Sequence, residues 1–332
     1  MSRSTPPGIE VADLVKSYDE VDAVRGVSFS VPPGEVFGFL GPNGAGKSTT
    51  INMLCTLAKP TSGTARISGF DVVTELSAVR RHLGLVFQDP TLDGYLTAAE
   101  NLRIHAGLYG IDPGVVGARM DQMLEMVDLA DRRDSPVMTF SGGMRRRLEI
   151  ARGLMHSPRV LFLDEPTIGL DPQTRSSIWR YLRALQEAEG TTIFMTTHYM
   201  DEAEFCDRIA IMDRGEIVVL DTPEALKASV GADRVVLGTT DNDAALAALQ
   251  DHFAIEATVA EGAVRFHVDS GEAFVPRLFA ELDVAITSVA VSRPTLDDVF
   301  MRYTGSTIRD AETAGVAAQN RALMRALAGA RR

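Results

Sequence analysis

The glycine-rich residues 41–49 read Gly41-Pro42-Asn43-Gly44-Ala45-Gly46-Lys47-Ser48-Thr49. The apolar run Val36–Leu40 before them predicts a buried strand, and the residues after them show a helical pattern with Ile51 and Leu54 on one face. In this order the pattern G-x-x-x-x-G-K-[ST] predicts a phosphate-binding loop, because backbone N–H groups and the helix N-terminus attract phosphate. Lys47 would reach the outer phosphates, and the Ser48 hydroxyl would bind Mg²⁺.

Two adjacent acids, Asp164 and Glu165, follow the apolar run 160–163. The run predicts a buried strand, and the phosphate sites of such sheets lie at the carboxyl ends of their strands. Asp164 would bind Mg²⁺, and Glu165 would orient or deprotonate a water that attacks the γ-phosphate. Alone, such a pair is as often structural, but downstream of a phosphate-binding loop it indicates nucleotide hydrolysis.

A second helix start, Ser141-Gly142-Gly143-Met144, precedes an amphipathic pattern that includes Leu148, Ala151 and Leu154. Ser141 is a natural N-cap, and Gly142 and Gly143 allow close access to the backbone, so this helix end is also suited to an anion. An ordinary helix cap is the alternative. We interpret the three basic residues that follow as a solvated helix face rather than as phosphate or partner contacts: Arg145, Arg146 and Arg147.

With these three motifs in order, the sequence resembles the ATP-binding-cassette (ABC) ATPases over residues 9–228. The resemblance adds a glutamine loop at Gln88, a D-loop at Leu170-Asp171 and a switch histidine at His198. It implies that Gln88 links the metal and the attacking water to a partner surface and that His198 contacts the γ-phosphate. It also implies that Tyr18 stacks on adenine, with a core or surface tyrosine as the alternative.

The resemblance implies ATP and Mg²⁺ as cofactors and assigns a role to each site residue. The catalytic residues are Lys47, Gln88, Glu165 and His198. The metal-binding residues are Ser48, Gln88 and Asp164. The nucleotide-binding residues are Tyr18, Gly41 to Thr49, and Ser141 to Gly143. It further implies a head-to-tail dimer in which each ATP lies between the phosphate loop of one subunit and Ser141–Gly143 of the other. The second subunit is expected to be an identical copy, with a related chain as the alternative.

The residues beyond the cassette indicate a second domain. From Arg234 the pattern predicts strand, helix, strand, strand, helix and strand, the βαββαβ order of a ferredoxin-like α+β domain. We therefore expect a disordered N-terminus at 1–8 and a P-loop α/β ATPase domain at 9–229 with an inserted helical subdomain at about 89–140. A C-terminal domain at 230–304 and a flexible basic tail at 305–332 would follow, the tail touching anionic lipid or a membrane subunit in the alternative interpretation.

The composition limits the classes of partner. The 332 residues carry 33 Lys+Arg and 45 Asp+Glu, a net charge of −12 that opposes general binding to nucleic acid. The longest apolar run, 244–249, is far shorter than the roughly 20 residues of a spanning helix. The start has no apolar stretch like that of a secretory signal, and the only two cysteines, Cys55 and Cys206, fit a reducing compartment. We expect a peripheral protein on the cytoplasmic face of the membrane.

Within the ABC ATPases, residues 141–148 and 294–300 resemble the daunorubicin-resistance type of drug-export ATPases, with nodulation exporters as close relatives. The signature differs from the family pattern by Phe140 in place of Leu and Met144 in place of Gln. The resemblance implies the ATP-hydrolysing subunit of a two-component exporter. Dimer closure on ATP would drive efflux of drugs or other hydrophobic compounds through a separate polytopic permease, bound by the helical surface between Gln88 and Thr139.

A non-transport ABC ATPase of translation or DNA repair is the alternative function. Translation-type members carry two cassettes in one chain, whereas this sequence has one phosphate-binding loop. Repair-type members insert a long coiled coil between the glutamine loop and the signature, and the distance from Gln88 to Ser141 is too short for one. A P-loop kinase would need neither the signature nor His198.

Overall fold

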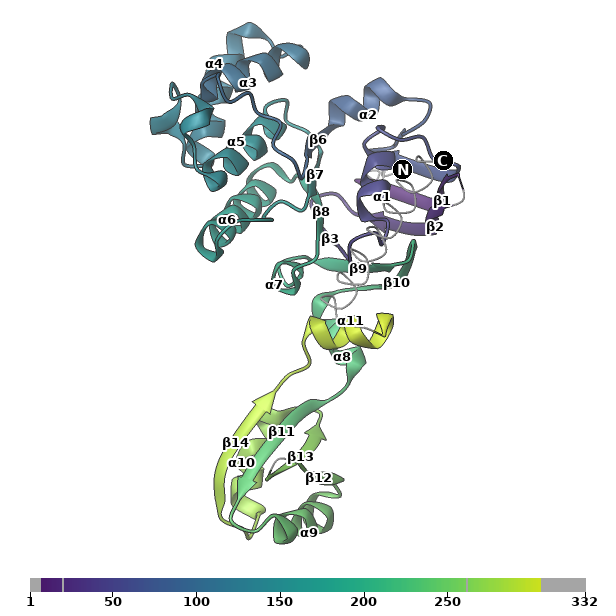
Figure 1. Cartoon of the computed structure of the whole chain (residues 1–332), viewed down its shortest axis with the longest axis vertical. Helices are drawn as coiled ribbons and strands as arrows, with labels where there is room; N and C mark the ends of the chain where they lie inside the picture. The colour runs from purple at the N-terminus through teal and green to yellow at the C-terminus, as the bar shows by residue number, and fades with distance from the viewer. Residues whose placement is uncertain (1–6, 20, 261, 306–332) are drawn as a thin grey trace, which may run out of the picture. The chain divides into compact units, whose positions relative to one another are not determined.

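The computed structural model describes residues 7–19, 21–260 and 262–305 (Figure 1). Its contacts divide the chain into two compact units that meet in sequence between Thr222 and Pro223. The expected disordered N-terminus at 1–8 lies outside the described residues except for positions 7 and 8. The expected tail at 305–332 lies outside them except for position 305.

The first unit contains a six-stranded sheet in the order β10-β9-β3-β8-β7-β6. Five strands are parallel: β6 (Leu83–Val86), β7 (Val160–Asp164), β8 (Thr192–Thr197), β3 (Val36–Leu40) and β9 (Arg208–Asp213). The sixth, β10 (Glu216–Asp221), forms an antiparallel hairpin with β9. Because parallel strands end at one edge, the residues after β3, β7 and β8 come together there.

A second sheet of the first unit is antiparallel and has the order β2-β1-β4-β5. Its strands are β1 (Ile9–Tyr18), β2 (Val21–Val31), β4 (Ser62–Ile67) and β5 (Phe70–Asp71). Phe29 of β2 stacks on Phe37 of β3 with 5.5 Å between ring centroids, and Phe37 lies 5.5 Å from Phe194 of β8.

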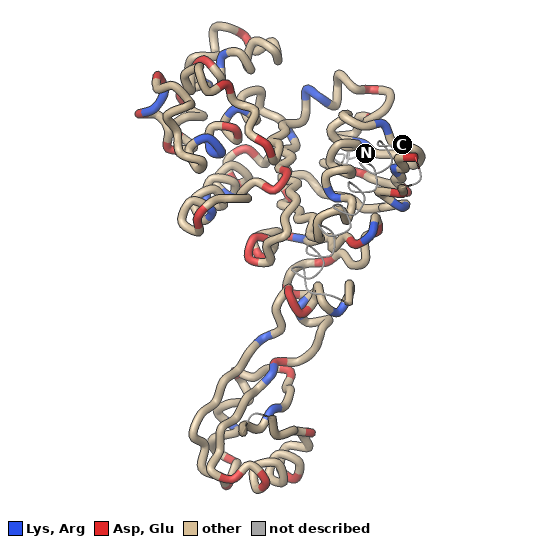
Figure 2. Tube along the Cα trace, in the orientation of Figure 1, with Lys and Arg blue, Asp and Glu red and all other residues tan. Residues whose placement is uncertain are grey.

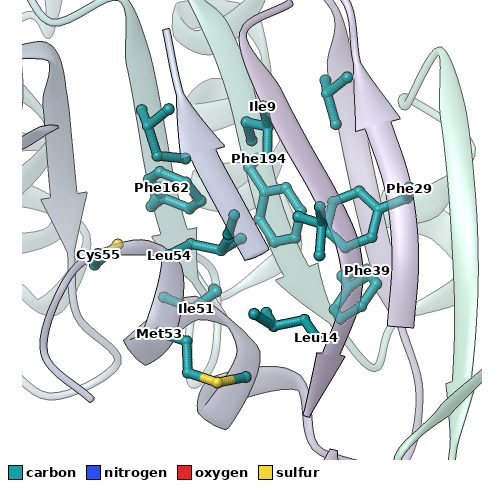
Figure 3. Close-up of a cluster of buried hydrophobic side chains, with 14 of the residues drawn as sticks. Ile9, Leu14, Phe29, Phe39, Ile51, Met53, Leu54, Cys55, Phe162 and Phe194 are labelled. Carbon is teal, nitrogen blue, oxygen red and sulfur yellow. The ribbon is translucent and has the colours of Figure 1, made fainter. Parts of the chain in front are cut away.

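The core between the sheets also holds helix α1 (Lys47–Leu54) in place. Ile51, Met53 and Leu54 of this helix are buried in the same cluster as the aromatic rings, and Figure 3 shows Ile51 and Leu54 pointing toward them. Since α1 begins at Lys47, this apolar packing fixes the position of the phosphate-binding loop.

Four longer helices follow β6, and each begins at a side-chain cap. Thr97 forms a capping box for α3 (Ala98–Leu108), and Asp112 caps α4 (Pro113–Met126). Ser141 caps α5 (Gly142–Leu154), and Asp171 caps α6 (Pro172–Glu189). Two further α-helices, α2 (Leu76–His82) and α7 (Met200–Ala203), and two short 3₁₀ turns, η1 (Ala130–Arg132) and η2 (Val137–Thr139), complete the unit.

Helices α3, α4 and α5 pack together on one side of the six-stranded sheet, with α1 on the other side (Figure 1). Basic and acidic residues are interspersed along these three helices (Figure 2). The sequence placed the helical insertion at about 89–140, whereas the packed group also includes α5, which begins after residue 140. Within the described residues, no helix has the length and apolar character needed to cross a bilayer.

The second unit has the predicted βαββαβ order. It comprises β11 (Asp233–Thr239), α9 (Asn242–Phe253), β12 (Ala257–Ala260), β13 (Ala263–Val268), α10 (Gly271–Glu281) and β14 (Ile286–Ser292). The sheet order β12-β13-β11-β14 is antiparallel throughout, as in a ferredoxin-like domain. Leu249 of α9 and Leu278 of α10 are buried in its core with Phe266.

Two flanking helices belong to this second unit. Helix α8 (Pro223–Val230) packs against α11 (Leu296–Thr304), where Arg302 donates a hydrogen bond to the Val230 carbonyl at 3.0 Å. The contacts begin the second unit at Pro223, ahead of the expected start at residue 230, so α8, with its buried Leu226, is grouped with α11.

Candidate functional site

The phosphate-binding loop lies between β3 and α1, where two of its glycines allow close backbone contacts. Gly46 has a left-handed φ of 107°, and a Cβ atom on it would lie 2.5 Å from the Ala23 carbonyl oxygen. A Cβ atom on Gly41 would lie 2.4 Å from the Met212 carbonyl oxygen. Any side chain at these positions would force the loop away from β2 and β9.

Lys47 is the first residue of α1, and its side chain is only 5% exposed. Its Nζ atom donates hydrogen bonds to the carbonyl oxygens of Gly41 at 2.5 Å and Pro42 at 3.1 Å. The same Nζ atom lies 3.8 Å from Oε1 of Glu165. The ammonium group is thus held inside the loop, where a phosphate oxygen would meet it.

Ser48 and Asp164 bring two oxygen donors together from different elements. The Ser48 hydroxyl donates to Oδ1 of Asp164 at 3.3 Å, and the Thr196 hydroxyl donates to the same oxygen at 2.5 Å. The backbone N–H of Glu165 in turn donates to the Thr196 hydroxyl at 3.0 Å. A hydroxyl and a carboxylate beside a phosphate loop match the oxygen ligands that Mg²⁺ prefers, so these residues fit that ion.

Glu165 is the centre of the cluster at the end of β7. Its Oε1 atom lies 3.4 Å from Nδ1 of His198, and its Oε2 atom accepts a hydrogen bond from Nε2 of Gln88 at 3.2 Å. Burial opposes the negative charge, but the interaction with His198 and the positive charge of Lys47 outweigh it and lower the pKa of Glu165. The carboxylate is therefore ionised at neutral pH and can accept a proton.

The predicted signature segment, Ser141 to Met144, does not lie at the phosphate-binding loop of its own chain. The Ser141 hydroxyl accepts a hydrogen bond from the Met144 N–H at 3.2 Å, which makes Ser141 the N-cap of α5. A Cβ atom on Gly143 would lie 2.4 Å from Cγ2 of Thr174, near the start of α6 in the D-loop region. Because α5 and α1 lie on opposite sides of the sheet (Figure 1), one chain does not bring this segment to its own phosphate loop.

Tyr18 is the last residue of β1 and is 47% exposed. The Lys16 ammonium lies 4.6 Å from the centroid of its ring. Tyr18 pairs with Val21 across the hairpin to β2, the strand that contacts the phosphate loop at Ala23. The structure therefore places the ring on the hairpin that borders the loop, and its stacking on adenine stays a prediction.

The expectation of a solvated face for Arg145 to Arg147 is wrong for two of the three: the side chain of Arg147 is 17% exposed and that of Arg146 is 8% exposed. Its guanidinium donates to the Pro166 carbonyl at 2.6 Å and to Glu149 at 3.0 Å. The sequence signal was available: Arg146 and Glu149 form an i, i+3 charge pair, and Glu149 lies within the apolar pattern of α5.

A second group that sequence reasoning missed surrounds Glu202, which is buried. Its carboxylate accepts hydrogen bonds from the hydroxyls of Thr197, at 2.6 Å, and Thr167, and it lies 3.7 Å from Nε of Arg175. Burial raises the pKa of Glu202 despite these partners. The group joins the segment after β8, which carries His198, to the segment after Glu165.

This parallel sheet, with a phosphate loop, an acid pair, a glutamine and a histidine at the ends of its strands, defines a phosphate-loop ATPase of the ATP-binding-cassette class. Residues 24–168 match the ABC transporter family. Residues 222–304 match the C-terminal domain of the DrrA1-3-like ATP-binding proteins.

Three relatives match this chain over most of its length. The linearmycin resistance ATP-binding protein LnrL of Bacillus subtilis is 38% identical over 91% of this chain and 100% of its own. The daunorubicin/doxorubicin resistance ATP-binding protein DrrA of Streptomyces peucetius is 40% identical over 94% of this chain and 97% of its own. Nod factor export ATP-binding protein I of Paraburkholderia xenovorans is 40% identical over 91% and 98%. The chain belongs to the DrrA-like family of ABC transporter ATP-binding proteins.

Solved structures agree with the fold of the first unit. The protein cbiO1 of Clostridium perfringens, part of the ABC transporter complex cbiONQ, has a TM-score of 0.63 at 30% identity and covers 67% of this chain and 91% of its own. The cassette MJ0796, solved as a dimer bound to ADP and Pi, has a TM-score of 0.59 at 30% identity and covers 64% and 98%. The predicted family and fold class are confirmed, and with them an ATP-binding ABC ATPase of a transporter.

Proposed function

We propose that this protein hydrolyses ATP to drive the export of drugs or other hydrophobic compounds through a separate membrane permease. The observation that supports it most is the full-length similarity to resistance and export ATP-binding proteins, which includes the second unit. The cluster around Glu165 supplies the hydrolytic chemistry, and the geometry of each residue supports a separate role.

Lys47 holds the outer phosphates of ATP through its ammonium group. Ser48 and Asp164 hold Mg²⁺, which neutralises phosphate charge when it is bound. Glu165 accepts a proton from the water that attacks the γ-phosphate, since its lowered pKa keeps it ionised. Gln88, which donates to Glu165, would orient this water and hold the metal, and His198, at 3.4 Å from the same carboxylate, would contact the γ-phosphate.

The separation of the signature segment from the phosphate loop supports a head-to-tail dimer. Ser141 and the two glycines after it begin α5, which lies on the other side of the sheet from α1 and its Lys47, so a second subunit would supply the complementary half of each site. The dimeric MJ0796 cassette is a precedent for a pair of this kind. An identical copy is the second subunit we propose.

Exposed apolar side chains support a docking surface for the permease between Gln88 and Thr139. Tyr95 is 87% exposed, and Met138, 62% exposed, lies beside it because its N–H donates to the Gly94 carbonyl at 2.8 Å. Ile104 and Leu108 are exposed one turn apart on α3. Apolar side chains on a cytoplasmic segment of the permease are the occupant we propose, and this contact would hold the protein at the cytoplasmic face of the membrane.

The test is capture of the permease from native membranes with tagged Glu165→Gln protein and ATP, followed by mass spectrometry. We expect a polytopic membrane protein to be recovered, and to be lost with the additional changes Tyr95→Asp and Leu108→Asp. Recovery of only ribosomal or DNA-associated proteins would contradict the exporter function and favour a role in translation or repair. The exposed position Phe279 of α10, which lies outside residues 88–139, supplies the matched control, Phe279→Asp, which should leave the capture unchanged.

A further inference from the structure

A buried pair on α5, Arg146 and Glu149, connects the signature helix to two parts of the hydrolytic site. Arg146 Nη2 donates to the carbonyl oxygens of Asp164 at 3.1 Å and Glu165 at 3.3 Å, and its Nε donates to that of Pro166 at 2.6 Å. One side chain thus holds the backbone of three consecutive residues at the end of β7.

The same pair also holds the glutamine loop on both sides of Gln88. Arg146 Nη1 donates to the Phe87 carbonyl, and Glu149 Oε1 accepts a hydrogen bond from the Thr91 N–H at 2.7 Å. The two side chains lie one turn apart and are joined by an ion pair of 3.0 Å. The catalytic glutamate and the glutamine that donates to it are therefore both attached to a single turn of α5.

Burial makes this arrangement costly unless every charge has partners. Both side chains are less than a tenth exposed, and burial lowers the pKa of Arg146 while the charge of Glu149 opposes that effect. Arginine presents its donors in a rigid planar fork, so its hydrogen bonds fix the positions of the acceptors and not only their charge. Glu165 has a left-handed φ of 46°, and the fork holds its carbonyl in this uncommon conformation.

We propose that Arg146 is a positioning residue that transmits movement of α5 to Glu165 and Gln88 of the same chain. The helix begins at Ser141, which in the proposed dimer contacts the ATP bound by the other subunit. Engagement of that ATP would shift α5, and Arg146 would carry the shift to the chain's own catalytic carboxylate. The two ATP sites of the dimer are then coupled through this side chain. The inference rests on the proposed function in its use of a head-to-tail dimer.

Arg147, the next residue of α5, provides a matched comparison. Its side chain is also largely buried, but it donates to the Val127 carbonyl at 2.8 Å and pairs with Asp128 at 3.3 Å, both at the end of α4. Loss of Arg147 removes a similar number of contacts from the same helix without touching the catalytic backbone. A general loosening of α5 would therefore appear in both variants, and a positioning role would appear only at Arg146.

The experiment compares the purified full-length wild type with Arg146→Gln, Arg146→Lys and Arg147→Gln. It measures kcat, KM and the Hill coefficient for MgATP hydrolysis, together with binding of trinitrophenyl-ATP and the melting temperature. For Arg146→Gln we expect kcat to fall at least tenfold, the affinity for the ATP analogue to stay within about twofold, and the Hill coefficient to fall from near 2 toward 1. Arg146→Lys keeps the charge but not the fork, so we expect it to recover stability without recovering the Hill coefficient.

Equal effects of Arg146→Gln and Arg147→Gln on kcat, the Hill coefficient and the melting temperature would overturn the inference, because a structural role alone would account for them. An Arg146→Gln protein with the kcat and Hill coefficient of the wild type would overturn it as well while leaving the proposed function intact. A wild type that binds the analogue without hydrolysing MgATP would instead contradict the proposed function, and the inference would fall with it.

Discussion

The Nζ atom of Lys47 lies 3.8 Å from the Oε1 atom of Glu165, although Lys47 begins α1 and Glu165 follows β7. This contact places the phosphate-binding cation next to the proton acceptor. It also explains part of the lowered pKa of Glu165, because the positive charge of Lys47 favours the carboxylate. Substitutions of Lys47 and of Glu165 should therefore affect different properties, ATP binding and ATP hydrolysis respectively.

Lys47→Ala should weaken ATP binding by about 10- to 100-fold, because hydrogen bonds to charged groups contribute roughly 1.5–3 kcal/mol. Isothermal titration calorimetry with ATP measures the loss directly. The melting temperature without nucleotide is the control, since a collapse of the loop would lower it and a loss of phosphate contact would not. Unchanged affinity for ATP would contradict the role of Lys47.

Glu165→Gln should keep ATP binding and slow hydrolysis by about 10²- to 10⁴-fold, the usual contribution of a general base. The amide is isosteric and can still interact with Gln88 and His198, so the site should retain its shape. Light scattering after gel filtration with MgATP should then show a persistent dimer. Turnover at the wild-type rate would show that another group accepts the proton.

Most of the fold and of the site could be predicted from the sequence because the local sequence patterns agree with the tertiary contacts that the fold requires. Short-range patterns predict the strand, loop and helix around Lys47 and the helix caps at Ser141 and Asp171. These elements form in the structure as their local sequence indicates. The βαββαβ order also followed from alternating short patterns. The inclusion of Gln88 in the site followed only from the family resemblance, and its hydrogen bond to Glu165 is seen only in the structure.

The features that the sequence did not predict depend on long-range contacts. The run of three arginines that includes Arg146 is typical of a solvated helix face, but carbonyl groups that bind Arg146 belong to β7 and the glutamine loop. Glu202 likewise stands in an acidic helix start that gives no sign of burial. The grouping of α8 with the second unit likewise depends on its contact with α11, far along the sequence. The i, i+3 spacing of Arg146 and Glu149 signals their ion pair, but no local pattern encodes the carbonyl groups that bind Arg146 or the partners of Glu202 and α8.

Low pH should destabilise the cassette through His105, near the end of α3. Its ring lies tilted against that of Tyr109 with 4.6 Å between centroids, and burial, followed by the charges of Arg152 and His156, lowers its pKa from 6.5 to about 4. The folded state thus binds fewer protons than the unfolded state between these values. The free energy of unfolding should therefore fall as the pH drops from about 6.5 to 4, by less than the roughly 3 kcal/mol of the full shift because the ring is partly solvated.

Urea denaturation at pH 7.5 and pH 5 tests this prediction. His105→Gln should shrink the difference in the free energy of unfolding between the two pH values, and His156, whose pKa burial also lowers, should account for part of the remainder. The exposed His252→Gln in the second unit is the control and should leave the difference as it is. A His105→Gln protein with the pH dependence of the wild type would refute the assignment.

The position of the domain boundary predicts how the second unit behaves on its own. A fragment of residues 223–305 keeps α8, which packs against α11; Leu226 of α8 and Val299 and Phe300 of α11 are buried. A fragment of residues 231–305 lacks α8, so apolar side chains of α11 that α8 covers become exposed to water. Full exposure of one such side chain costs about 1.5–3 kcal/mol. Both should fold, since the ferredoxin-like core lies within residues 233–292, but the longer fragment should be more stable by about 2–4 kcal/mol in urea denaturation. If the two fragments had the same free energy of unfolding, α8 would belong with the cassette, as the sequence pattern alone suggested. In that case Leu226→Ala should not change the stability of the longer fragment either.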